Sequence, residues 1–148
     1  MKKIIGAGVL MLATFGAWAQ TDVTISSLAT GSATKAGFAA MVKGHTLPGW
    51  VTRGATESPA HDVTLAGKHY QVFSACKPHD CASERIAVIY SADDKTMAGL
   101  FSKTDEKTSS EKLSWLNVPD DLSIDGKTVL FAALSGSLEN HPEGFNYQ

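Results

Sequence analysis

The sequence predicts an α+β domain in which a central antiparallel sheet of about five strands has helices packed on one face. Two observations support this fold class. Short segments with alternating or β-branched residues follow one another and are separated by turn residues. A segment with helical spacing precedes them at residues 33–43, and a short apolar run follows at 129–134. The 148 residues suffice for one domain with a real core.

The first residues have the form of an export signal. Lys2 and Lys3 make a positive start, an apolar stretch follows, and Ala-Trp-Ala at 17–19 has the pattern of a cleavage site. We therefore predict a cleaved secretory signal peptide over 1–19, a single mature domain over 20–148, and a periplasmic location in a Gram-negative cell. An uncleaved anchor is the alternative. After cleavage, no run is long and apolar enough to span a membrane.

Charge limits the choice of partners. Removing the signal takes away two lysines and no acidic residue, so the formal charge changes from −2 to −4. This mild negative charge argues against nucleic acid as a partner and weakly favours a basic one. The apolar fraction of 43% is ordinary for a globular protein and argues against disorder.

The first part of the mature chain predicts one helix. Residues 21–28 begin polar and are expected to be extended or loop. Residues 33–43 are expected to be helical, because apolar residues recur at i, i+3 and i+4 from Phe38 and Gly44 follows where a C-cap glycine belongs. Residues 50–52 are strand-like.

The middle of the chain predicts most of the sheet. Residues 61–65 and 69–75 alternate between apolar and polar side chains, and Ala-Gly-Lys at 66–68 can turn the chain between them. These two runs predict a β-hairpin. The β-branched run at 85–90 and the apolar run at 97–101 predict two further strands.

The last third of the chain begins with a polar segment and continues with more apolar ones. Residues 102–112 predict a solvated loop or a frayed helical turn, and residues 113–118 are expected to anchor the chain to the core. The run at 129–134 fits a buried strand or a buried helix. Its alanines and the following Gly136 favour the helix. The tail over 139–148 is expected to be loop-like.

The cysteines enclose the most distinctive stretch of the sequence. Cys76 and Cys81 are its only two cysteines, and in an oxidising compartment such a pair most often forms a disulfide. The ring would hold Lys77, Pro78, His79 and Asp80, and the proline would stiffen it. A ring this small adds only about 2 kcal/mol of stability. We therefore expect the disulfide to fix a local shape rather than to hold the fold together.

Four interpretations of this loop are open: redox catalysis, metal binding, a stapled turn without a partner, and recognition of another molecule. A thioredoxin-like redox site needs two residues between its cysteines, but here there are four. A metal site could use Cys76, His79 and Cys81, with His61 or His69 as a fourth ligand, although the thiols would oxidise and the short ring strains a tetrahedral arrangement. A stapled turn without a partner is the plain alternative. No sequence motif for phosphate binding or for hydrolysis is present.

Recognition is the interpretation we favour. A rigid loop loses little entropy on binding, so a small loop can bind tightly. The imidazole of His79 can donate hydrogen bonds, and carboxylates in a cleft are its natural acceptors. Lys77 adds positive charge toward the same target.

Residues 76–81, Cys-Lys-Pro-His-Asp-Cys, resemble the signature loop of the Ivy family, the inhibitors of vertebrate lysozyme. Further similarity covers essentially the whole mature chain, in the segments 24–29, 105–109, 115–118, 123–134 and 136–142.

The resemblance implies a periplasmic inhibitor of C-type lysozyme that protects murein and is neither an enzyme nor a cofactor-binding protein. In the family, the loop enters the active-site cleft of the lysozyme and its histidine engages the two catalytic carboxylates. Carried over, that histidine is His79; Lys77, Pro78 and Asp80 shape the loop, and the two cysteines staple it. Family members are homodimers, so a homodimer is implied. C-type lysozymes are strongly basic and would attract a chain with negative charge.

Overall fold

The computed structural model describes residues 23–148, so the predicted signal peptide lies outside the described part. Its centre is an antiparallel sheet in which neighbouring strands follow the order β1-β3-β4-β5-β6, and β2 also pairs with β3. The six strands are β1 (Thr56–Glu57), β2 (His61–Leu65), β3 (Lys68–Cys76), β4 (Glu84–Ser91), β5 (Thr96–Asp105) and β6 (Ser110–Leu116). The predicted α+β class is confirmed. No helix within 23–148 is both long enough and apolar enough to cross a membrane.

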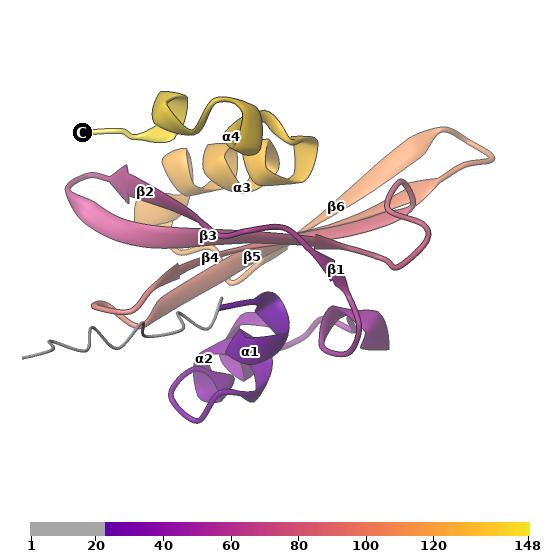
Figure 1. Ribbon diagram of the computed structural model, residues 1–148, viewed down its shortest axis with the longest axis horizontal. Coiled ribbons are helices and arrows are strands. Elements are labelled where there is room, and N and C mark those ends of the chain that lie inside the picture. The colour runs from indigo at the N-terminus through magenta and orange to yellow at the C-terminus, as the bar shows by residue number, and fades with distance from the viewer. Residues whose placement is uncertain (1–22) are drawn as a thin grey trace, which may run out of the picture.

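Helices cover both faces of the sheet (Figure 1). α1 (Ile25–Thr30) and α2 (Lys35–Met41) pack on one face, and α3 (Asp125–Ser135) and α4 (Ser137–Asn140) pack on the other. The prediction that helices lie on one face is therefore wrong in that detail. Residues 23–148 also contain three 3₁₀ turns: η1 (Gly49–Val51), η2 (Asp120–Leu122) and η3 (Pro142–Phe145).

The central strands explain why both faces are covered. In β4, Ile86 and Val88 belong to the core beneath α1 and α2, whereas Ala87 and Ile89 belong to the core beneath α3 and α4. All four side chains are fully buried. A continuous apolar run in a strand requires cover on both faces, because successive side chains point to opposite faces.

α1 forms where the sequence predicted an extended segment, and this prediction is wrong. The backbone N–H of Ser27 donates to Thr24 Oγ1 at 3.2 Å, and the N–H of Thr24 donates to Ser27 Oγ at 2.8 Å, which is a reciprocal capping arrangement. Glu57 of β1 accepts a further bond from the N–H of Ile25 at 2.9 Å. A carboxylate distant in the sequence therefore helps to fix the start of the helix.

Five predicted elements are confirmed. The strands predicted at 85–90 and 97–101 are β4 and β5. α2 lies inside the predicted helix at 33–43. The predicted hairpin is β2–β3, and Ala66 and Gly67 both have positive φ, as a two-residue turn of type I′ requires. The helix preferred over a strand at 129–134 is α3, which ends at Gly136 in the left-handed conformation.

Two other predictions are wrong. Residues 50–52, predicted as strand-like, lie in and just after the 3₁₀ turn η1. Residues 102–112, predicted as a loop or frayed turn, contain the end of β5, a turn and the start of β6, with Lys103 opposite Lys112 and Thr104 opposite Glu111. Apolar and polar side chains do not alternate in residues 102–112, so the sequence gives no sign that these segments pair as strands.

Candidate functional site

The cysteine loop connects β3 to β4 at one end of the sheet. Cys76 and Cys81 form a disulfide with their Cα atoms 4.8 Å apart, which confirms the predicted staple. Cys76 lies opposite Arg85 in the ladder, and the N–H of Lys77 donates to the carbonyl of Glu84 at 3.0 Å. The ring therefore begins directly at the end of a paired ladder, which holds its base in place.

The four residues inside the ring form a tight turn. The N–H of Asp80 donates to the carbonyl of Lys77 at 3.1 Å, Pro78 follows Lys77, and His79 has a φ of +62°. Proline at the second position and positive φ at the third are the marks of a type II turn. Positive φ is uncommon outside glycine, although histidine adopts it more readily than most residues. The turn therefore holds His79 at its apex, where the residue is exposed.

The two charged side chains of the turn bind each other. Lys77 Nζ lies 2.9 Å from Asp80 Oδ2, and Ser83 Oγ donates to the same carboxylate oxygen at 2.6 Å. The hydrogen bond from Lys77 and then that from Ser83 hold the pKa of Asp80 below its ordinary value. Within residues 23–148, no side-chain hydrogen bond involves His79. The imidazole is therefore the group of the turn that remains available to a partner.

Glu84 supports the base of the loop. Its carboxylate accepts a hydrogen bond from Trp50 Nε1 at 2.8 Å and lies 3.3 Å from Lys103 Nζ. Burial by itself would raise the pKa of Glu84, but the hydrogen bonds from Trp50 and Lys103 outweigh burial, and the pKa lies below its ordinary value. Glu84 therefore links the loop to η1 and to β5.

Arg85 supports the loop from the other face. Its Nη1 donates to the carbonyl of Leu134 at the end of α3 at 2.9 Å, and its Nη2 lies 2.9 Å from Glu111 of β6. Glu111 also accepts from the buried Ser102 hydroxyl. The guanidinium therefore joins helix α3 to strand β6 directly behind the disulfide.

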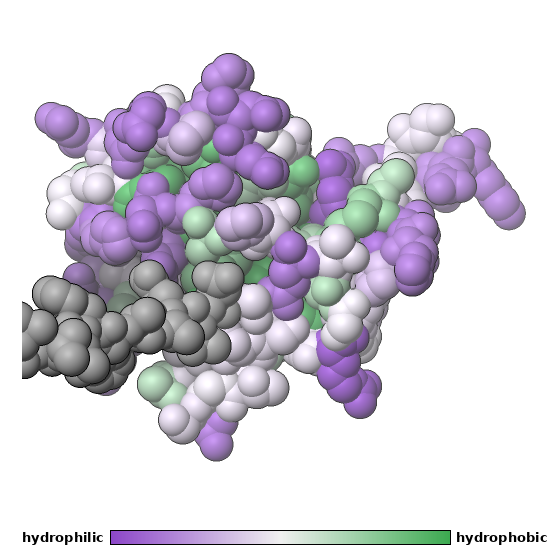
Figure 2. All heavy atoms as spheres, in the orientation of Figure 1, coloured by the Kyte–Doolittle hydropathy of each residue, from purple (hydrophilic) through white to green (hydrophobic). Residues whose placement is uncertain are grey.

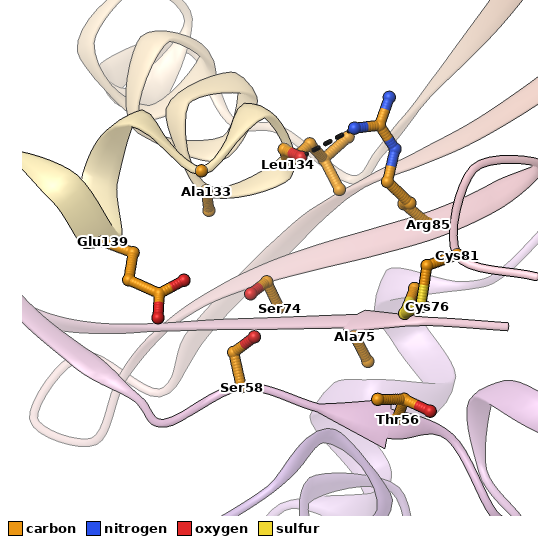
Figure 3. A pocket seen from close by; sticks show the side chains of 11 residues that line it. Thr56, Ser58, Ser74, Ala75, Cys76, Cys81, Arg85, Ala133, Leu134 and Glu139 are labelled. Atoms are coloured by element: carbon orange, nitrogen blue, oxygen red, sulfur yellow. Dashed lines mark hydrogen bonds between the residues drawn. A yellow bond between two sulfur atoms is a disulfide. The ribbon is translucent and has the colours of Figure 1, made fainter. Parts of the chain in front are cut away.

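A hollow of about 190 Å³ lies behind the ring. Figure 3 shows the disulfide and Arg85 at one end of it, with Leu134 of α3 hydrogen-bonded to Arg85, and Ala133 and Glu139 further along the hollow. Because Cys76 and Cys81 both line this hollow, the ring is not held by close packing against the helix. The paired strands and the hydrogen bonds described above fix its position instead.

The structure argues against the metal alternative. Both thiols are consumed by the disulfide. His61 and His69 lie about 13 Å and 23 Å along the strands from Cys76, from about 3.3 Å per residue. Among residues 23–148, no three His, Cys, Asp or Glu side chains are grouped so that they could hold a metal ion.

Comparison with known proteins decides the family. A family model described as "Inhibitor of vertebrate lysozyme (Ivy)" matches residues 33–136. The chain belongs to this family. It is 63% identical over 147 residues to the Escherichia coli K12 protein named "Inhibitor of vertebrate lysozyme", with 99% of this chain and 93% of that protein covered.

Two further proteins are similar to this chain over shorter stretches. A Pseudomonas aeruginosa protein of the same name is 37% identical over 68 residues, with 45% of this chain and 44% of that protein covered. An uncharacterized Yersinia pestis protein is 32% identical over 117 residues, with 73% of this chain and 71% of that protein covered.

Sequence reasoning found the loop and missed the residues that hold it. Ser83, Glu84 and Arg85 stand between the second cysteine and the β-branched run of β4, and their polar character is the signal that could have marked them as supports. Trp50 and Glu111 could not have been found in this way. Their contacts with the loop base depend on how the chain folds back over the sheet.

Proposed function

We propose that this Ivy family member is a periplasmic inhibitor of C-type lysozyme, whose β3–β4 loop enters the active-site cleft and whose His79 engages the catalytic carboxylates. The observation that carries the proposal is the state of His79. It is exposed at the apex of a stapled turn, and its side chain makes no hydrogen bond within residues 23–148, whereas Lys77 and Asp80 are paired with each other. The Escherichia coli relative, 63% identical, bears the name of a lysozyme inhibitor.

The proposed mechanism follows from the chemistry of the target. Lysozyme hydrolyses glycosides with two carboxyl groups, one that donates a proton and one that stays ionised. An imidazole between them can donate a ring N–H to the ionised group and hydrogen-bond the other. The loop then occupies the place of the scissile bond, so inhibition is reversible and stoichiometric and involves no covalent step.

Preorganisation explains how a short loop can bind with useful affinity. Binding by a flexible loop has to overcome the cost of ordering it. Here the disulfide, the turn hydrogen bond and the Lys77–Asp80–Ser83 contacts order the loop before binding. Residues 1–19 act as the export signal, residues 20–148 form the mature inhibitor, and the resemblance further implies a homodimer.

The test is a titration of the purified mature protein against a C-type lysozyme that clears a murein suspension. Loss of clearing should saturate near a fixed molar ratio. The variant His79→Ala should weaken inhibition by more than about 1 kcal/mol, or roughly fivefold, because it removes the hydrogen bonds to charged carboxylates. No inhibition by a large excess of the wild-type protein would refute the proposed function.

The matched control is His141→Ala, because His141 is an exposed histidine between α4 and η3 and contributes no residue to the loop. It should inhibit like the wild-type protein. Equal potency of His79→Ala and His141→Ala would refute the role given to His79 while leaving inhibition itself intact.

A further inference from the structure

The β5–β6 hairpin projects beyond the rest of the sheet. β4 ends its pairing with β5 at Glu84, which lies opposite Lys103, but β5 continues to Asp105 and pairs there with Ser110 of β6. We call residues 104–110 the hairpin tip. Figure 1 shows the hairpin tip extending at the same end of the molecule as the loop between β3 and β4.

Packing does not explain this projection. Residues 102–112 are all polar, and the outer end of the hairpin in Figure 2 is coloured hydrophilic or neutral. A two-stranded ribbon without an apolar face is marginally stable in water. The hairpin tip is steadied by its contact with the loop, because the N–H of Thr104 donates to the carbonyl of Ser83 at 2.7 Å.

The hairpin tip and the loop form the two walls of one cleft. An open cleft of about 450 Å³ is lined by Lys77 and Asp80 on the loop side and by residues 103–107 on the hairpin side. The hydrogen bond that Lys77 donates to Asp80 is the main cause of the raised pKa of Lys77, and the charge of Glu106 contributes across the cleft. The hairpin tip therefore lies close enough to the loop for one partner to touch both.

Glu106 is the acidic group of the hairpin tip that is free to contact a partner. It is exposed, and no ion pair within residues 23–148 involves it. The neighbouring Asp105 has a structural role, since its Oδ1 accepts the backbone N–H of Lys107 at 2.9 Å and shapes the turn.

We propose that the hairpin tip is a second contact surface for the same lysozyme, and that Glu106 binds a basic side chain at the rim of the cleft that the loop enters. This inference rests on the proposed function. A partner that admits the loop must present its rim to the structure beside the loop, and the hairpin tip is that structure. The partner is strongly basic, so an exposed carboxylate suits its rim.

The experiment compares two variants. Glu106→Gln removes a negative charge from the hairpin tip, and Lys107→Gln removes a positive charge from the adjacent exposed side chain. Both variants keep the loop intact. Affinity and association rate for a C-type lysozyme should be measured at about 50 mM and about 500 mM salt. Glu106→Gln should weaken binding roughly three- to tenfold at low salt and less at high salt, because salt screens exposed charges. Lys107→Gln should bind at least as tightly as the wild-type protein.

Hydrogen exchange at the backbone amides of residues 105–109 distinguishes a direct contact between the hairpin tip and lysozyme from electrostatic attraction at a distance. Contact predicts slower exchange when lysozyme is bound. Weaker binding by Glu106→Gln without slower exchange would overturn the proposed contact, as would binding by both variants within twofold of wild type. Absence of binding by the wild-type protein would instead refute the proposed function, so the two failures are distinguishable.

Discussion

Removing the disulfide should weaken lysozyme binding more than it weakens the fold. The perturbation is the double substitution Cys76→Ser/Cys81→Ser. The bond closes a ring with a sequence separation of 5, for which the chain-entropy estimate is about 2 kcal/mol. For the 126 described residues, an unfolding entropy of about 2.1 cal/mol/K per residue converts this loss into a decrease in Tm of about 8 °C.

The fold should survive the change because the neighbouring ladder does not depend on the sulfurs. β3 and β4 stay paired from Gln71 opposite Tyr90 to Cys76 opposite Arg85, positions whose hydrogen bonds come from the backbone. The loop has less support. If two of its four inner residues become free in the unbound state, ordering them on binding costs about 2–3 kcal/mol, which corresponds to a 30- to 150-fold loss of affinity.

Two measurements test this prediction. Urea denaturation gives the change in the free energy of unfolding, and calorimetry with a C-type lysozyme gives the change in affinity. Ala82→Ser, an exposed substitution next to the ring that leaves the disulfide intact, is the control and should change neither quantity. A large loss of the folded state, with full affinity in the fraction that remains folded, would refute the argument from preorganisation.

Two further predictions concern the charged groups around the loop. The hydrogen bond from Lys77 and then that from Ser83 hold the pKa of Asp80 in the folded protein below its ordinary value. The ion pair with Lys77 should therefore persist to a lower pH than the ordinary pKa of an aspartate would allow, and it should open as the pH falls through the folded pKa. An NMR titration of the Asp80 carboxyl with a midpoint at or above the ordinary value of an aspartate would contradict this. Arg85→Met should lower the free energy of unfolding by about 1–3 kcal/mol, because it leaves the carbonyl of Leu134 without its donor. The exposed Lys103→Met should cost less than about 1 kcal/mol, and equal effects in urea denaturation would argue against a supporting role for Arg85.

The elements that sequence reasoning found are those whose signals are local. The β2–β3 hairpin has alternation on both sides of Ala66 and Gly67, so its strands and its turn agree. The staple needed only two cysteines and an oxidising compartment, and the loop between them followed directly.

The elements that sequence reasoning missed depend on contacts between distant segments. Glu57 stabilises the start of α1 from β1, and the hairpin tip is steadied by Ser83 from the neighbouring loop. The cover on both faces of the sheet had a signal, because Ile86 to Ile89 is a continuous apolar run rather than an alternation. That run was available in the sequence and implies two layers of helices.

The ion pair between Lys77 and Asp80 makes it possible to distinguish long-range electrostatic attraction from the contacts that the loop itself is proposed to make. Because these charges neutralise each other within the turn, the proposed insertion of the loop would bring an imidazole rather than a net charge into the cleft. Under that proposal, attraction over long distances comes from the net charge of the whole protein, to which exposed carboxylates such as Glu106 contribute in addition to any direct contact. Salt should therefore act mainly on the association rate, whereas His79 and the disulfide should act mainly on the dissociation rate. Equal salt dependence of the two rates would show that the loop itself carries the electrostatic attraction.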